Sequence, residues 1–109
     1  MTADVFGLYE LSNDGTVLYS RARSDNHTAD AKPVVGRDFF YEIFDCKNME
    51  DLRRHFRSFI TTDRSADSFI FDCFFEREVI RTKIFMTRAY ENDQDHSNGI
   101  VILDIREAS

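Results

Sequence analysis

Two cysteines, Cys46 and Cys73, are the side chains of this sequence best suited to covalent chemistry. A thiolate is a nucleophile and a metal ligand, whereas a buried thiol behaves as a small apolar side chain. The two cysteines lie 27 residues apart in a chain with cytosolic character, so we do not expect a structural disulfide. Cys73 falls within a predicted strand and is expected in the core. For Cys46 three interpretations stay open: a core residue, a covalent attachment point, or a thiol for redox chemistry or other ligation.

The other reactive side chains show no spacing that is typical of a catalytic or metal site. His27, His55 and His96 have no ligand spacing with one another or with either cysteine, and a metal site needs three or four converging ligands. The sequence also contains no nucleophile and base in a hydrolase pattern. We therefore predict a noncatalytic protein without a metal.

The composition is that of one small globular domain. The chain has 109 residues, 42% of them hydrophobic, and its eleven Phe predict a core built largely of aromatic rings. A net charge of −6 argues against nucleic-acid binding, although Arg53, Arg54 and Arg57 form a local basic cluster. The N-terminus does not read as a signal peptide, and no apolar stretch is long enough to cross a membrane. We expect a cytoplasmic protein.

The first half of the chain predicts a β-hairpin followed by helices. Residues 6–11 and 16–20 are short β-rich runs that are joined by the turn residues of SNDG. Residues 36–46 place apolar side chains at helical offsets and predict one or two helical turns. A longer helix begins after Asn48, a predicted N-cap, and carries an apolar stripe. The stripe consists of Met49, Leu52, Phe56, Phe59 and Ile60.

The second half predicts three strands. Residues 68–75 alternate so that four side chains share one face, residues 79–89 are rich in β-branched side chains, and residues 99–105 form the last strand after a polar hairpin tip at 90–99. The four side chains on one face are those of Phe69, Phe71, Cys73 and Phe75. The element order predicts an α+β fold, a five-stranded antiparallel sheet with helices packed on one face and the first hairpin beside the last strand.

Several motifs resemble PAS domains of the photoactive yellow protein family. Residues 34–46, VVGRDFFYEIFDC, share a V-x-G-basic-x-F-F opening with that family and its distance to a cysteine, here Cys46. The first hairpin, the F-x-F-x-x-x-F pattern from Phe69 to Phe75, and TKIFMTRA at 82–89 match as well. The resemblance covers about residues 6–89. It implies a single PAS-like sensor domain over 1–109, with a core at about 6–106.

The resemblance also implies a chromophore site. In the family the cysteine carries p-coumaric acid as a thioester, and a Tyr and a protonated Glu hold its phenolate. Cys46 matches the attachment position. Counting back from Val34, Tyr19 and Arg23 take the Tyr and Glu places, whereas counting forward from the first hairpin gives Ser20 and Ser24. Neither register supplies a glutamate.

Our leading functional hypothesis is a sensory or regulatory PAS module that binds a small, largely apolar ligand between the sheet and the helices. We expect the ligand to lie beside Cys46, Tyr19 and Arg23, in a pocket lined by Phe40, Phe44, Phe69, Phe71 and Met86. Signalling would pass through a partner protein or a homodimer. Two alternatives stay open: an interaction scaffold whose core is filled by Phe rings, and a light sensor with a p-coumaroyl thioester at Cys46.

Overall fold

The computed structural model describes residues 6–22, 34–44, 46–62, 64–90 and 99–108. Five strands form one antiparallel sheet in the order β2-β1-β5-β4-β3. The strands are β1 (Gly7–Ser12), β2 (Val17–Ala22), β3 (Ala66–Phe74), β4 (Val79–Tyr90) and β5 (Gly99–Glu107). The predicted sheet is confirmed, including the position of the first hairpin beside the last strand.

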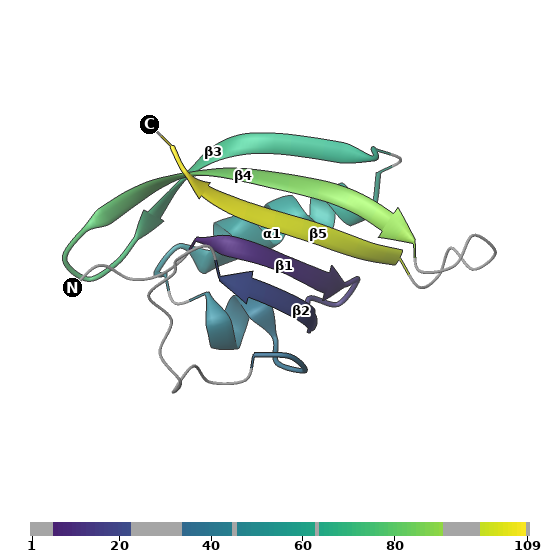
Figure 1. Ribbon diagram of the computed structural model, residues 1–109. Coiled ribbons are helices and arrows are strands. Elements are labelled where there is room, and N and C mark those ends of the chain that lie inside the picture. Colours follow the sequence, from purple (N-terminus) through teal and green to yellow (C-terminus); the bar gives the residue numbers. More distant parts are fainter. Residues whose placement is uncertain (1–5, 23–33, 45, 63, 91–98, 109) are drawn as a thin grey trace.

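Two helical elements lie on one side of the sheet (Figure 1). The short π-helical turn η1 spans Phe39–Ile43, and the longer helix α1 spans Met49–Ile60. The Asp38 carboxylate accepts hydrogen bonds from the N–H groups of Phe40 and Tyr41, which begins η1. The Phe44 N–H donates to the Phe39 carbonyl at 2.7 Å, which closes η1 as a wide turn. The helices predicted from residues 36–46 and from Asn48 onward are both present.

The core lies between these helices and the inner face of the sheet. Leu52, Phe56 and Phe59 of α1 are buried, while Met49 and Ile60 of the same stripe are half-buried. Alternation along the strands turns the opposing apolar side chains inward. These include Leu11, Phe71, Cys73, Ile84, Met86, Val101, Leu103 and Ile105. Aromatic rings and branched aliphatic side chains thus form a single core, as the composition predicts.

The turn of the first hairpin packs directly onto η1. Gly15 has φ +92°, a conformation that favours glycine, and a Cβ at this residue would lie 3.2 Å from the Phe40 ring. The Phe39 N–H also donates to the Gly15 carbonyl at 2.9 Å. The hairpin turn and η1 are therefore held as one unit.

Asn48 differs from its predicted role. It precedes α1, but its side chain makes no capping hydrogen bond to the helix. The Asn48 amide instead donates to the Asp72 carbonyl at 2.7 Å and accepts from the Phe74 N–H at 3.0 Å. Asn48 thus occupies the predicted N-cap position, but its side chain bonds to edge strand β3, which offers unpaired backbone groups to this amide.

None of the helices in the described ranges is long and apolar enough to cross a bilayer.

Candidate functional site

The structure brings most of the predicted pocket residues together. Phe40, Phe44, Phe71 and Met86 are all buried, and Cys46 is 8% exposed in the same core. Phe69 is half-buried at the edge of this core, where its ring stacks on the His55 ring with centroids 4.2 Å apart. The predicted group is therefore one contiguous part of the core.

Tyr19 lies apart from this group. It is 45% exposed and pairs with Glu10, so it shares the outer face of the sheet. Ser20 pairs with Tyr9, whose ring contacts Phe39 on the inner face. Successive strand residues point to opposite faces of the sheet, so Ser20 points inward and Tyr19 outward. Counting forward from the hairpin, which gives Ser20, therefore identifies the inward residue. Arg23 and Ser24 lie outside the described residues.

Five phenylalanine rings form a continuous row through the core. We call this the aromatic row; it runs Phe56, Phe40, Phe39, Phe44, Phe71. Successive ring centroids are 5.1, 5.2, 5.4 and 6.3 Å apart. These are ordinary contact separations for aromatic pairs. The row therefore connects helix α1 through η1 to strand β3 without a gap between successive rings.

Cys46 lies near the β3 end of the aromatic row, beside a second thiol. The Cys46 and Cys73 thiols share a hydrogen bond, and the Thr82 hydroxyl also contacts Cys73. Thr82 is buried and donates to the Phe71 carbonyl at 2.7 Å. The hydrogen bond with Cys46, followed by burial, raises the pKa of the Cys73 thiol above its ordinary value. Cys73 is therefore a protonated thiol at neutral pH.

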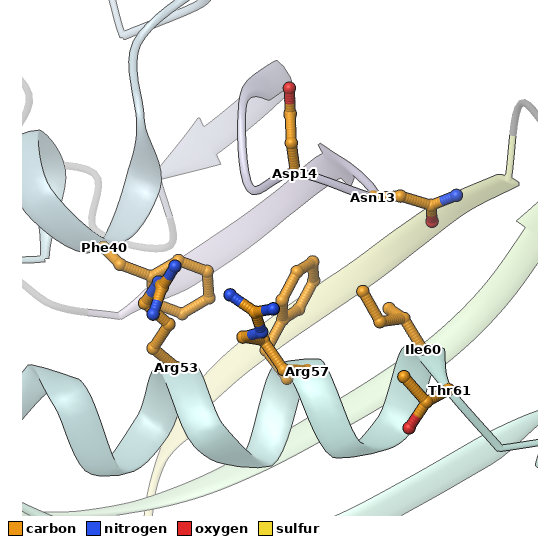
Figure 2. Close-up of a pocket in the computed structure, with 8 residues that line it drawn as sticks. Asn13, Asp14, Phe40, Arg53, Arg57, Ile60 and Thr61 are labelled. Atoms are coloured by element: carbon orange, nitrogen blue, oxygen red, sulfur yellow. The ribbon is translucent and has the colours of Figure 1, made fainter.

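A hollow of about 310 Å³ opens between the hairpin turn and helix α1 (Figure 2). We call it the hairpin–helix hollow. Its lining comes from three elements and combines aromatic, aliphatic and charged side chains. The lining residues are Asn13, Asp14, Phe40, Arg53, Phe56, Arg57, Ile60 and Thr61. Phe40 and Phe56 are the first two rings of the aromatic row, so the row reaches this hollow.

Two guanidinium groups give the hollow its charge. Arg53 and Arg57 are one helical turn apart on α1, and both rise from the helix toward the hairpin (Figure 2). Arg53 lies 3.8 Å from the Glu50 carboxylate and over the Tyr41 ring. Arg57 has no ion pair with any residue that the structure describes. Arg57 is therefore the cation of the hollow that is available to an anion.

The acidic residue at the rim does not neutralise this cation. In Figure 2 the Asp14 side chain points away from α1. Its carboxylate accepts hydrogen bonds from the Ser12 hydroxyl and from the N–H of Thr16. These bonds, with that from Ser12 largest, lower the pKa of the Asp14 carboxyl. Asp14 thus serves the hairpin turn rather than the hollow.

The sequence pattern predicts Phe40 as a pocket residue but does not indicate the hollow. In the sequence, Arg53 and Arg57 stand out only as part of a basic cluster. Arg53 and Arg57 are four residues apart, so they lie on the same side of the helix. Phe56 and Ile60 of the apolar stripe are next to them, which places the two arginines at the edge of the buried face. This spacing does not predict that α1 lies against the hairpin turn, because the two segments are far apart in the sequence.

The described residues do not fit a p-coumaroyl group at Cys46. A buried phenolate needs strong donors, because desolvation otherwise raises its pKa until it protonates. Thr82 and Asp104 are the buried polar side chains of the described ranges, and Thr82 already donates to Phe71. Asp104 pairs with Leu8 and Phe85 on the outer face, and Tyr19 is exposed.

Within the described ranges, no group of three or more His, Cys, Asp or Glu side chains is arranged to hold a metal ion.

Comparison with known proteins supports the resemblance. Photoactive yellow protein of Halochromatium salexigens is 25% identical over 89 residues, which are 81% of this chain and 71% of the relative. That of Rhodothalassium salexigens is 26% identical over 91 residues, with the same coverage of both chains. No protein-family model matches the sequence.

Solved structures show the same fold. The PAS domain of BvgS from Bordetella pertussis superposes with a TM-score of 0.68 at 15% identity, covering 95% of this chain and 77% of the other. The photoactive yellow protein domain of the sensor histidine kinase Ppr from Rhodospirillum centenum gives 0.67 at 22% identity, covering 94% and 86%. The chain therefore has the PAS fold, and its sequence is similar to photoactive yellow protein.

Proposed function

We propose that this chain is a noncatalytic sensory or regulatory PAS module that binds a small ligand in the hairpin–helix hollow. The ligand has an apolar, preferably aromatic, body and one carboxylate. The observation that carries the proposal is the Arg57 guanidinium, which has no ion pair in the described part of the chain and lines the same hollow as the ring of Phe40.

The lining of the hollow supports this class of ligand. Ligand pockets are mostly apolar and contain a few polar groups that fix orientation. The Phe40 and Phe56 rings supply the apolar contact, and guanidinium groups bind carboxylates through paired hydrogen bonds. A volume of about 310 Å³ is at the lower end of small-molecule pockets, which suits a single aromatic ring with a short acidic chain.

The aromatic row supplies a route from the hollow to the sheet. A ligand that packs against Phe40 binds best to the arrangement of rings that offers the most contact. Binding therefore shifts the population of protein conformations toward that arrangement. Phe39 and Phe44 are in contact beyond Phe40, and Phe71 belongs to edge strand β3. We propose that binding is reported to a partner protein, or to a second copy of the chain, in the cytoplasm.

The first experiment measures ligand binding by titration calorimetry with 4-hydroxycinnamate as the probe. We expect binding to the wild-type protein and a loss of about tenfold or more in affinity for Arg57→Gln, because one charge-assisted hydrogen bond is worth about 1.5–3 kcal/mol. Arg54→Gln is the matched control. Arg54 is on the same helix but is strongly exposed and paired with Asp51.

A second control separates charge from ring stacking. The uncharged amide of the same acid keeps the ring but loses the carboxylate, so we expect it to bind as weakly as the acid binds to Arg57→Gln. Equal affinity for acid and amide, or equal loss in Arg54→Gln and Arg57→Gln, would contradict the proposed site.

A second candidate function has its own support. The rings of the aromatic row are in contact beside Cys46, which is the filled core expected of an interaction scaffold. Ile70, Phe74 and Val79 expose apolar side chains around edge strand β3, where a partner could cover them. If no carboxylate probe binds and charged substitutions at these three residues abolish partner binding while the fold persists, the scaffold is the better account.

A further inference from the structure

Cys46 and Cys73 are neighbours in the core, although 27 residues separate them in the sequence. Both are free thiols, and they share a hydrogen bond. Cys46 lies in the short connection between η1 and α1, and Cys73 is the penultimate residue of β3. The fold therefore brings two thiols from distant parts of the chain within hydrogen-bonding reach of each other.

Hydrogen bonds to the backbone of β3 hold this arrangement. The Lys47 N–H donates to the Phe74 carbonyl at 2.8 Å. The Asn48 amide donates to the Asp72 carbonyl at 2.7 Å and accepts from the Phe74 N–H at 3.0 Å. These bonds join the two residues after the first cysteine to the residues on either side of the second. The segment that carries Cys46 is thus fixed against the strand.

The two thiols differ in access to solvent. Cys46 is 8% exposed, whereas Cys73 is 0% exposed. An oxidant from solvent therefore meets Cys46 first. Cys73 lies behind it, within hydrogen-bonding reach of the Cys46 thiol. This is the arrangement of an attacking thiol and a resolving thiol.

We infer that Cys46 and Cys73 are a modification site that closes to a reversible intramolecular disulfide when the protein meets a hydroperoxide. The Cys46 sulfur attacks the terminal oxygen of the hydroperoxide, the O–O bond breaks, and an alcohol (or water, from hydrogen peroxide) leaves. The Cys46 sulfenic acid is then attacked by the Cys73 sulfur. The S–S bond forms, the S–O bond breaks, and the thiol proton leaves with the hydroxyl as water.

Closing this disulfide changes both the chain and the site. It ties the connection before α1 covalently to β3 and closes a loop that contains the whole helix. It also consumes the Cys46 thiol, which is then no longer available for any other covalent modification. The inference does not rest on ligand binding in the hairpin–helix hollow.

Hydrogen peroxide is the probe for the test, applied to the dilute, intact, reduced protein. We expect each chain to lose the mass of two hydrogen atoms and both thiols to become unreactive to iodoacetamide after unfolding. Peptide mapping should find Cys46 linked to Cys73, and dithiothreitol should restore both thiols. Cys73→Ser is the control, in which Cys46 oxidises without an intramolecular disulfide.

A redox titration in glutathione buffers keeps the test independent of how well that variant folds. The equilibrium constant for forming the Cys46–Cys73 disulfide is measured for the wild type in native buffer and in strong urea. In urea the chain is unfolded, so the disulfide forms only by closure of a random loop. We expect the equilibrium constant for disulfide formation to be at least tenfold larger in native buffer. An equal or smaller native constant, persistence of both thiols, or disulfides only between chains would overturn the inference.

Discussion

The neighbouring Cys46 thiol and, after it, burial raise the pKa of the Cys73 thiol. Its thiol is 0% exposed and receives its largest influence from the Cys46 thiol beside it. Both the shared hydrogen bond and desolvation disfavour the thiolate. A thiol in this state contributes to the core as a small apolar side chain until the neighbouring sulfur is oxidised.

This state predicts a pH dependence of stability. The folded pKa of Cys73 lies above the unfolded value of about 9. The unfolded chain therefore loses the proton first as pH rises, so the contribution of Cys73 is fully present below pH 9 and is lost above it. We expect the free energy of unfolding of the wild type, relative to Cys73→Ala, to fall by about 1.4 kcal/mol per pH unit above pH 9.

Urea unfolding between pH 7 and pH 10.5, with a reductant present, measures this difference. Between pH 7 and pH 8 the two proteins should differ by a constant amount, which serves as the internal control. A difference that stays constant up to pH 10.5 would mean that Cys73 ionises as readily in the folded protein as in the unfolded chain.

Asn48 links two elements of the fold, since its side chain joins the start of α1 to edge strand β3. Asn48→Ala removes two hydrogen bonds to backbone groups of β3. At about 1 kcal/mol for each bond, we expect a loss of about 1–2 kcal/mol in the free energy of unfolding. Ser58→Ala, at an exposed position on the same helix, should change it by less than about 0.5 kcal/mol. Equal effects of the two substitutions in urea unfolding would show that the bonds to β3 are not stabilising.

The elements were largely predictable from the sequence because their signals are local. The alternation around Phe71 and the stripe through Leu52 and Phe56 each specify one face of one element. The bonding of Asn48 was not predictable, since its partners are 24 and 26 residues away. Sequence counting alone left the registers of Tyr19 and Ser20 open, because a one-residue shift exchanges the two faces of a strand.

The candidate site was predictable only in part. The Phe residues that fill the core could be named from their pattern, and Phe40 does border the hairpin–helix hollow. The hollow itself depends on the hairpin turn lying against α1, and the contact of Cys46 with Cys73 depends on how η1 leads into that helix. Both are tertiary contacts between segments that are distant in the sequence, and local sequence patterns do not predict such contacts.

On the scale of the whole molecule, the aromatic row relates the hollow to the sheet. Its rings extend from Phe56 on α1 to Phe71 on β3, and the Cys46–Cys73 pair lies near its far end. Packed interiors transmit small displacements because few voids absorb them. A ligand at one end of the row and a disulfide at the other could therefore act on the same packing.

An NMR titration of the isotope-labelled protein with 4-hydroxycinnamate tests this account most directly. We predict saturable shifts of the backbone amide signals of Gly15, Phe40 and Arg57, with smaller shifts that continue to Phe44 and Cys46, while the amide of Ile70 on the outer face stays unchanged. An absence of shifts at millimolar ligand, or shifts that avoid the hairpin and α1, would contradict the proposed site and the sensory role built on it.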